Sequence, residues 1–424
     1  MKPKFKTLSI ILLIITFLLV ASLGLPIFID LVLILIIALL TKLNLKILIN
    51  LNIMLMIATF IGNFLLIKNF NEDTFYYRAH EKFFINKKKN YIKNINYKTL
   101  MPHGDLGAMD VCNNFLDIAA PRNQLFITDE NGFRNDRHKI YESDIIFVGD
   151  SFIAGSSNSQ EHVPANIFED LTKQKTYSIT SISTPKIYER HIAEQIKKMK
   201  SNAKIYLFYF SGNDFDYKFL NRNEINNNSS KYNDSFKTKI RFGYERLERN
   251  KDKFFIEKIS KINDKNIFYK KIRPKSQRFY KKILTKWTES CPVKYKNIQG
   301  HKVGFYYDFD FFLNENNYKA KYITSHIIND DNILKKIKKI YYIPTKYEIY
   351  QNFFNEEKIV KLNNFEYLKR EYKKYDKEVI DLTQILKNEA ELRLNENKFI
   401  YWKDDTHWNI YGIEAAMKFI SKNK

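Results

Sequence analysis

Residues Asp144-Ile-Ile-Phe-Val-Gly-Asp-Ser151 place a short apolar run directly before a Gly-Asp-Ser turn. A second run of the same kind, Ile205-Tyr-Leu-Phe-Tyr-Phe210, leads into Ser211-Gly-Asn-Asp214. Short apolar runs bounded by turn residues are typical of strands that are buried on both faces. Both runs are therefore expected to be central strands of a sheet, with polar residues at their carboxyl ends.

Helix and strand patterns alternate around these two runs. Helical spacing is present near 163–173 and 186–200, and a further helix is expected at about 382–392. Additional strands are expected at Val303–Tyr307, Lys339–Ile343 and Glu378–Asp381. Because alternating strands and helices favour a parallel sheet, the fold class is expected to be α/β.

A third polar motif, Asp404-Asp-Thr-His-Trp-Asn409, lies far from the first two in the sequence. His407 has acidic residues two and three positions before it, so either Asp404 or Asp405 could orient its ring. An imidazole that is held in this way can accept a proton from a serine such as Ser151. The Asn213 side chain offers an N–H to a developing oxyanion. Taken together, these residue types favour ester chemistry.

The three motifs resemble those of the SGNH/GDSL hydrolase superfamily. Gly149-Asp-Ser151 is similar to its first block, Gly212-Asn-Asp214 to its third, and Asp404 to His407 to its last. The resemblance implies a flavodoxin-like parallel sheet with flanking helices. It also implies that Ser151 is the nucleophile and that Ser151, Gly212 and Asn213 supply oxyanion donors. It implies no metal and no organic cofactor.

Within the superfamily, Asp405-Thr-His-Trp408 with Asn409 and Gly412 resembles a membrane-associated branch. That branch handles acetyl groups of cell-envelope polysaccharide and includes alginate O-acetylation proteins. Asn131-Gly-Phe-Arg134 and Ile343-Pro-Thr-Lys-Tyr-Glu-Ile-Tyr350 are also similar to it. The resemblance covers about 125–215 and 335–424.

The chain departs from the superfamily pattern in the second and third blocks. The second-block glycine, an oxyanion donor, should fall within Ser178–Pro185, where there is none. A backbone N–H of Ser181 or Ser183 could replace it. Ser211 stands where the superfamily often has glycine. The superfamily spacing favours Asp404 as the acid, whereas the Asp-Thr-His-Trp form slightly favours Asp405.

The first part of the chain is strongly apolar and predicts a membrane anchor. Three spans are expected, at roughly 8–24, 26–41 and 45–67. Lysines before the first span and between the second and third predict a cytoplasmic N-terminus, with residue 71 onward on the extracytoplasmic side of a bacterial inner membrane. If the first two spans were one, the domain would face the cytoplasm.

The remaining sequence divides into a lead-in region, a core and an insertion. The lead-in region is 71–140, the SGNH-like core is 141–220 with 335–424, and the insertion is 221–334, which is rich in Lys, Asn and Tyr and could shape the substrate site. Cys112 and Cys291 fit no metal spacing and could either pair or remain thiols.

The composition provides room for a sizeable core and argues against a nucleic-acid partner. The chain has 424 residues, of which 45% are hydrophobic, and a formal net charge of +23. Only 13 of its 70 basic residues are arginine, the residue on which nucleic-acid readout usually relies. A solvated lysine-rich surface is therefore the expected reading of the charge.

The expected function is a membrane-anchored serine esterase or O-acyltransferase that acts on acyl esters, chiefly acetyl esters, of envelope carbohydrate. A transferase would need a separate multi-span membrane protein as acyl carrier, because three spans are too few to carry acyl groups across the membrane. A catalytically silent polysaccharide-binding or scaffold module is the first alternative. A lipase-like or phospholipase-like esterase close to the bilayer is the second.

Overall fold

The computed structural model describes residues 83–85, 90–110, 117–180, 184–219, 293–306, 320–354 and 363–423. The chain divides into two compact units, and all of these residues belong to the unit formed by Tyr76–Ser229 and Pro292–Lys424. The expected membrane spans, Cys112 and Cys291 lie outside the described residues. None of the described helices is both long enough and apolar enough to cross a membrane.

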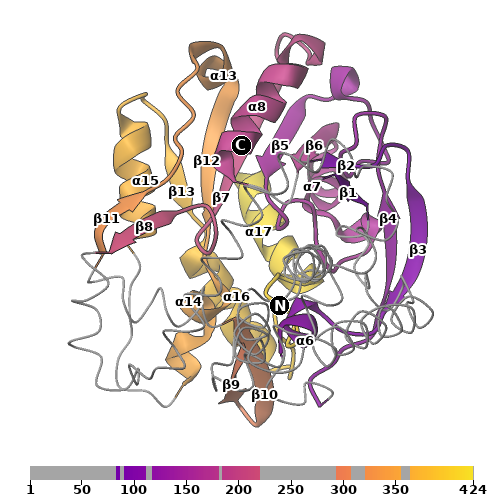
Figure 1. The fold of residues 1–424 in the computed structure, drawn as a ribbon, viewed down its shortest axis with the longest axis vertical. Coiled ribbons are helices and arrows are strands. Elements are labelled where there is room, and N and C mark those ends of the chain that lie inside the picture. Colours follow the sequence, from indigo (N-terminus) through magenta and orange to yellow (C-terminus); the bar gives the residue numbers. More distant parts are fainter. Residues whose placement is uncertain are drawn as a thin grey trace, which may run out of the picture. The chain divides into compact units, whose positions relative to one another are not determined.

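A five-stranded parallel sheet forms the centre of this unit (Figure 1). Its strand order is β13-β12-β7-β5-β6, which is 2-1-3-4-5 when read from the other edge and counted along the chain, as in flavodoxin-like sheets. All neighbouring strands are parallel, which confirms the α/β expectation. The strands are β5 (Ile145–Gly149), β6 (Thr176–Thr180), β7 (Lys204–Phe210), β12 (Ile337–Ile343) and β13 (Val379–Asp381).

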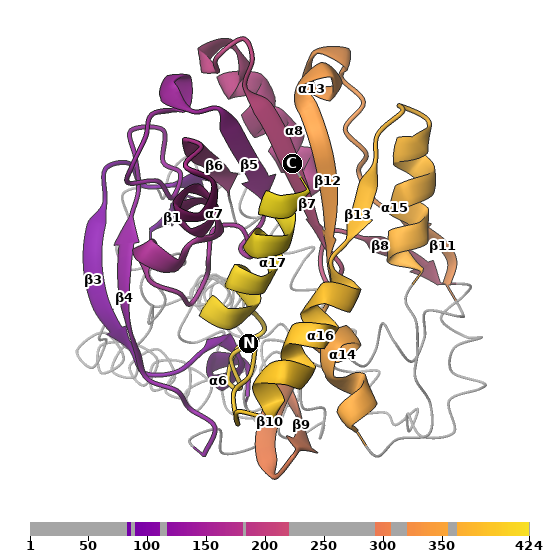
Figure 2. The same cartoon turned by 180° about the vertical axis from the view of Figure 1, so that it is seen from behind.

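Helices cover both faces of the sheet. Successive strand residues point to opposite faces, and because the central strands are continuous apolar runs, both faces need to be buried. Phe147 belongs to one hydrophobic core and its neighbour Val148 to the other. Figure 2 shows the face covered by α7 (Pro164–Thr172), α16 (Thr383–Leu394) and α17 (Ile410–Lys422). The other face carries α8 (Pro185–Gln195), α13 (Asp331–Lys336) and α15 (Asn364–Lys373).

Short antiparallel pairs and turns of helix surround the main sheet. The pairs are β1 (Phe84–Ile85) with β2 (Asn90–Tyr91), β3 (Asn96–Met101) with β4 (Arg122–Ile127), β8 (Asp216–Phe219) with β11 (Ala320–Thr324), and β9 (Val293–Ile298) with β10 (His301–Tyr306). The short helices are α6 (Asp105–Met109), α14 (Lys346–Tyr350), η1 (Ile140–Glu142), η2 (Gln160–His162), η3 (Ile196–Lys198) and η6 (Gln351–Phe353).

The sheet order fixes where ligands can bind. The chain leaves β5 toward β6 on one side and then returns to β7 on the other side of β5. In open α/β sheets the crevice at such a switch point, outside the carboxyl ends of the strands, is the usual ligand site. Ser151 follows β5 and Asn213 follows β7, so two of the predicted motifs flank this point.

Candidate functional site

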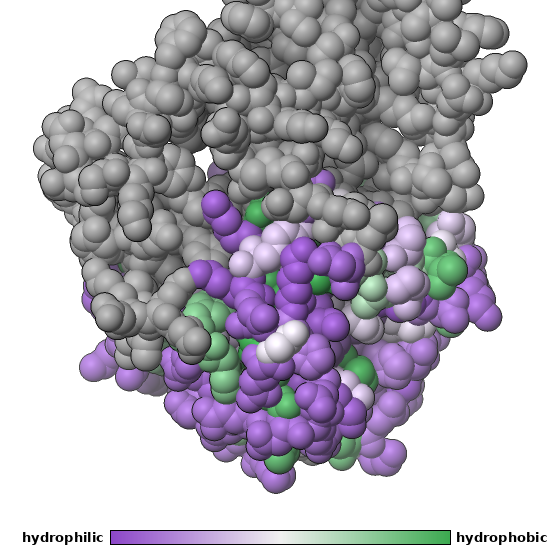
Figure 3. Space-filling model, turned by 90° about the horizontal axis from the view of Figure 1, so that it is seen from below, coloured by the Kyte–Doolittle hydropathy of each residue, from purple (hydrophilic) through white to green (hydrophobic). Residues whose placement is uncertain are grey.

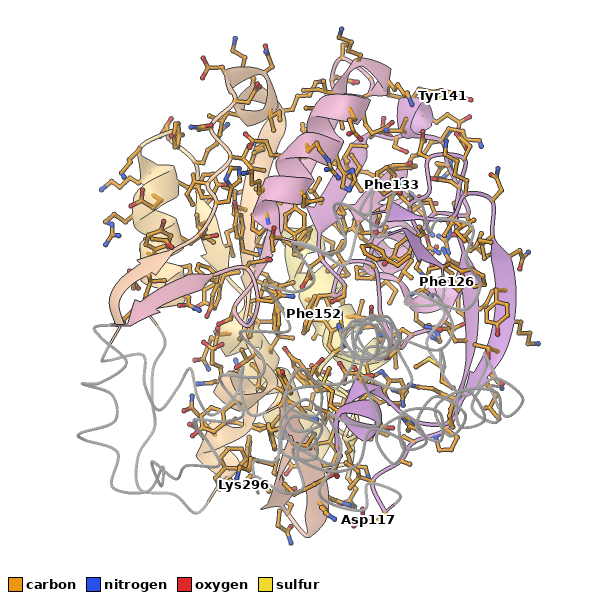
Figure 4. All side chains as sticks on the ribbon, viewed as in Figure 1. Asp117, Phe126, Phe133, Tyr141, Phe152 and Lys296 are labelled. Atoms are coloured by element: carbon orange, nitrogen blue, oxygen red, sulfur yellow. The ribbon has the colours of Figure 1, made fainter. Side chains whose placement is uncertain are left out.

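Ser151 lies in a tight turn at the carboxyl end of β5 and is 8% exposed. The turn needs Gly149, because a Cβ at that position would stand 2.6 Å from a side-chain carbon of Ile153. The next residue, Phe152, stacks on Phe210 with ring centroids 4.1 Å apart and packs against the His407 ring at 4.9 Å. Phe152 is labelled near the centre of Figure 4, below the ends of the strands. The turn therefore fixes Ser151 between the sheet and the motif near the C-terminus.

His407 joins Ser151 to a carboxylate. Its Nε2 lies 2.8 Å from Ser151 Oγ, and its Nδ1 lies 2.6 Å from Asp405 Oδ1. The backbone N–H of His407 also donates to Asp405 Oδ1 at 3.0 Å. A ring whose Nδ1–H faces a carboxylate presents Nε2 as the acceptor for the serine proton. Three residues singled out from the sequence are thus brought together in the order that acyl transfer needs.

Asp404, the other candidate acid, points away from the imidazole. Its Oδ2 accepts hydrogen bonds from the backbone N–H groups of Gly104 and Ala120, at 2.8 and 2.9 Å. Its Oδ1 accepts from Arg122 Nη1 at 3.0 Å. Both aspartates are fully buried, but the contact with His407 belongs to Asp405.

The second carboxylate oxygen of Asp405 is held by three donors that the sequence analysis did not identify. Asp405 Oδ2 accepts from the backbone N–H of Asp105 at 2.9 Å, from Ser157 Oγ at 2.5 Å and from Arg122 Nη2 at 3.3 Å. Multiple donors to a carboxylate favour its ionised form and fix its direction. The donors stand 248 to 300 positions away in the chain, and no local pattern marks them.

Arg122, at the start of β4, links three parts of the site. Its guanidinium reaches both Asp404 and Asp405, and its Nε donates to the Ser157 carbonyl at 3.1 Å. The same group lies over the Trp402 ring, 4.1 Å from the centroid. A planar guanidinium can donate to several acceptors at once and stack on an aromatic ring, whereas a lysine ammonium could not make all of these contacts.

A second buried arginine holds the loop that follows the nucleophile. Arg134 is 1% exposed, and its guanidinium donates to the carbonyls of Ala154, Gly155, Leu125 and Asn158 and to Gln160 Oε1, at 2.7 to 3.1 Å. Burial lowers the pKa of Arg134 to about 10, so the group remains charged at neutral pH. The loop it binds contains two residues with positive φ, Gly155 and Ser157.

Lys346 holds the Asp404–His407 loop through main-chain carbonyl groups. Its buried ammonium donates to the main-chain carbonyls of Gly304, Trp402, Lys403 and Asp405, at 2.6 to 3.2 Å. The backbone N–H of Gly304 in turn donates to the Lys403 carbonyl at 2.9 Å. Strand β10, from the segment predicted to be an insertion, is therefore hydrogen-bonded to the loop that carries the histidine.

The Trp-Asn-x-x-Gly end of the motif has structural roles. Trp408 Nε1 donates to the Phe152 carbonyl at 3.1 Å, which ties the histidine loop to the serine turn. The Asn409 side chain caps α17 by accepting from Tyr411 and Gly412 N–H groups. A Cβ on Gly412 would stand 2.5 Å from the Ile400 carbonyl oxygen, so only glycine fits that approach.

The predicted oxyanion residues lie at the end of β7. Gly212 is buried and Asn213 is exposed, and the Asn213 side chain interacts with the Asp150 carboxyl beside Ser151. Burial raises the pKa of Asp150 to about 6, against the effect of the Phe152 N–H donor. Burial, together with the charge of Asp150, also raises the pKa of Asp214 well above its ordinary value. Ser181 and Ser183, the candidates for the missing second-block donor, lie outside the described residues.

Within the described part of the chain, one group of side chains converges closely enough to hold a metal ion. It consists of Asp105, Asp405 and His407, whose nearest donor atoms lie within 4.8 Å of one another. These atoms already bond to protein groups, since Asp105 Oδ2 accepts from the Thr406 hydroxyl and Asp405 Oδ1 faces His407. A metal would have to displace those hydrogen bonds, so the arrangement fits proton transfer better. Comparison of the chain with protein-family models, with curated proteins and with solved structures gave no match.

Proposed function

We propose that this protein is an SGNH-type serine esterase or O-acyltransferase, anchored in a bacterial inner membrane by its N-terminal segment. The observation that supports this proposal best is the relay of Ser151, His407 and Asp405, with contacts of 2.8 and 2.6 Å. Its position beside the switch point of a parallel sheet adds support, because α/β folds place ligands there.

The proposed reaction proceeds through a covalent acyl-enzyme. Ser151 Oγ bonds to the acyl carbon while its proton passes to His407 Nε2. The resulting imidazolium is stabilised by Asp405 through Nδ1–H. As the bond between the acyl carbon and the leaving oxygen breaks, His407 gives the proton to the leaving alcohol. An acceptor hydroxyl then attacks the acyl carbon, its proton passes to His407, and Ser151 regains a proton as its ester bond breaks.

The developing oxyanion requires hydrogen-bond donors at the carboxyl ends of β5 and β7. The backbone N–H groups of Ser151 and Gly212 and the side-chain amide of Asn213 are proposed for this role. The exposed Asn213 side chain would have to turn from Asp150 toward the substrate.

We favour envelope carbohydrate as substrate, with acetyl as the acyl group, on the extracytoplasmic side of the membrane. The coloured part of the surface in Figure 3 is mostly hydrophilic, with hydrophobic residues in separate spots, which fits a sugar better than long acyl chains. A multi-span acyl-carrying membrane protein is the proposed partner of a transferase. Water as acceptor gives an esterase instead. No metal and no organic cofactor has a role in the proposed steps.

The test is turnover of a small acetate ester by the full chain and by Ser151→Ala and His407→Ala variants. Removal of either residue from a working triad should lower kcat by about 10⁴-fold or more. Ser156→Ala is the matched control, because the Ser156 hydroxyl is buried in the same loop and contacts no hydrogen-bond partner among the described residues. Equal, slow turnover by all four proteins would contradict the proposal and favour a polysaccharide-binding module. A preference for long acyl chains would favour a lipase.

A further inference from the structure

A second carboxylate approaches the same nitrogen of His407 that Asp405 holds. Asp105 Oδ2 lies 3.6 Å from His407 Nδ1, and the Asp105 side chain is 2% exposed. Asp105 begins α6, in the region that the sequence predicts to be only a lead-in to the domain. Asp105 stands 302 positions before His407 in the chain, and no motif near His407 includes it, but in space it borders the ring.

 The two residues are therefore brought together by the fold and by no local pattern of sequence.

Hydrogen bonds fix the orientation of the Asp105 carboxylate beside the His407 ring. Its Oδ1 accepts from the backbone N–H of Thr406 at 2.8 Å, and its Oδ2 accepts from the Thr406 hydroxyl at 2.5 Å. Its own backbone N–H donates to Asp405 Oδ2 at 2.9 Å. The Thr406 hydroxyl, which donates this hydrogen bond to Asp105, lies 3.3 Å from His407 Nδ1. Asp105 is thus fixed relative to both the acid and the ring.

Several other charged side chains lie around His407, and each is placed differently from Asp105. Asp405 faces Nδ1, and Asp150 acts electrostatically on the ring from the serine side. Arg122 is bound to the carboxylates of Asp405 and Asp404, so its positive charge offsets theirs. The ammonium of Lys346 contacts the main-chain carbonyl of Asp405.

We infer that Asp105 is a positioning and charge-stabilising residue that acts together with Asp405 on His407. This inference rests on the proposed function. When the Ser151 proton reaches Nε2, the ring becomes a cation whose Nδ1 faces two carboxylates, one at 2.6 Å and one at 3.6 Å. A carboxylate within this range favours the charged form of an imidazole. Asp105 therefore strengthens His407 as a base and lowers the barrier to proton transfer.

The experiment compares Asp105→Asn with the parent, both as full chains. The variant keeps the shape of the side chain and removes its charge. We expect the pKa of His407, measured by NMR titration of ¹⁵N-histidine, to fall by about one unit. The acid limb of kcat/KM should move to lower pH by a similar amount, because a ring with a lower pKa stays neutral down to a lower pH. The plateau of kcat/KM should fall about tenfold, as one pKa unit implies.

Two further variants separate charge from packing. Thr406→Val removes the hydroxyl bonded to Asp105 but leaves the carboxylate in place, so the His407 pKa should stay within about 0.3 units of the parent. Asp330→Asn makes the same chemical change at the N-cap of α13, where asparagine caps equally well, and should leave the pH profile unmoved.

The inference is overturned if Asp105→Asn lowers turnover without moving the His407 pKa, or if Thr406→Val moves it as far as Asp105→Asn does. Either result would mean that Asp105 only maintains the packing of the loop. The NMR titration needs no substrate. A parent without ester turnover would therefore contradict the proposed function, while the Asp105 comparison would still be decided by the titration.

Discussion

Replacement of Arg122 by methionine tests how the buried acid is held. The Arg122 side chain is 8% exposed and faces two carboxylates, of Asp404 and Asp405, whose side chains are fully buried. Arg122→Met keeps much of the apolar stem that packs near Trp402 but removes the charge. Two aspartates then remain in a buried site without their cation.

The expected loss of stability follows from the contacts that remain. Removing one partner of a buried ion pair costs about 3–5 kcal/mol, because the other charge is left uncompensated. Asp404 keeps the N–H donors of Gly104 and Ala120, and Asp405 keeps Ser157 and the N–H of Asp105, so the lower end applies. A loss of about 3 kcal/mol should lower the midpoint of thermal unfolding by roughly 6–12 °C.

The assay is thermal unfolding of the full chain followed by circular dichroism, with ester turnover measured beside it. Arg137→Met is the matched control, because Arg137 also forms a two-pronged pair, with Asp170, but on the surface. An exposed pair contributes at most about 1 kcal/mol. Arg122→Lys should fall between the two, since an ammonium cannot bridge both aspartates. Equal midpoints for Arg122→Met and Arg137→Met would refute the reasoning.

Two further substitutions test the close approach at the acid and the charge beside the nucleophile. Gly104→Ala places a Cβ 2.5 Å from Asp405 Cβ, so both the unfolding midpoint and ester turnover should fall. Gly300→Ala, at a site with φ +84° where no atom of the described residues lies within 4 Å, should cost roughly 1 kcal/mol of stability and leave turnover unchanged. Burial raises the pKa of Asp150 to about 6, so the folded state binds the proton more tightly than the unfolded state, and stability should fall as pH rises from about 4 to about 6. Asp150→Asn should remove roughly 2 kcal/mol of that fall, measured by urea unfolding across this range, and an unchanged slope would contradict the prediction.

Much of the fold could be predicted from local patterns, because the central strands are continuous apolar runs. The expected strand at Asp144–Val148 is β5, the run Ile205–Phe210 lies in β7, and the run Lys339–Ile343 lies in β12. Strand β6 (Thr176–Thr180) was not predicted. Its sequence, Thr-Tyr-Ser-Ile-Thr, is largely polar, although all five residues are buried. The strand therefore lacks the continuous apolar run by which the other central strands can be recognised.

The site was predicted only where its residues form compact motifs. Ser151 and His407 stand in short recognisable blocks, and the structure places them 2.8 Å apart. Asp105, Arg122 and Ser157 could not be found in this way, because each is a single common residue whose role depends on a partner hundreds of positions away. The choice between Asp404 and Asp405 likewise depends on where backbone N–H groups from 104 and 120 point.

The separation of the serine from its histidine has a consequence for the timing of activity. The two residues are 256 positions apart in the chain. At about 5–20 residues per second, roughly 13–50 s pass between the synthesis of Ser151 and that of His407. During that interval the serine turn has neither its base nor the Trp408 contact that anchors it. Under the proposed function, the growing chain would therefore be inert toward esters until the segment that carries His407 and Trp408 has been made and has packed against the serine turn.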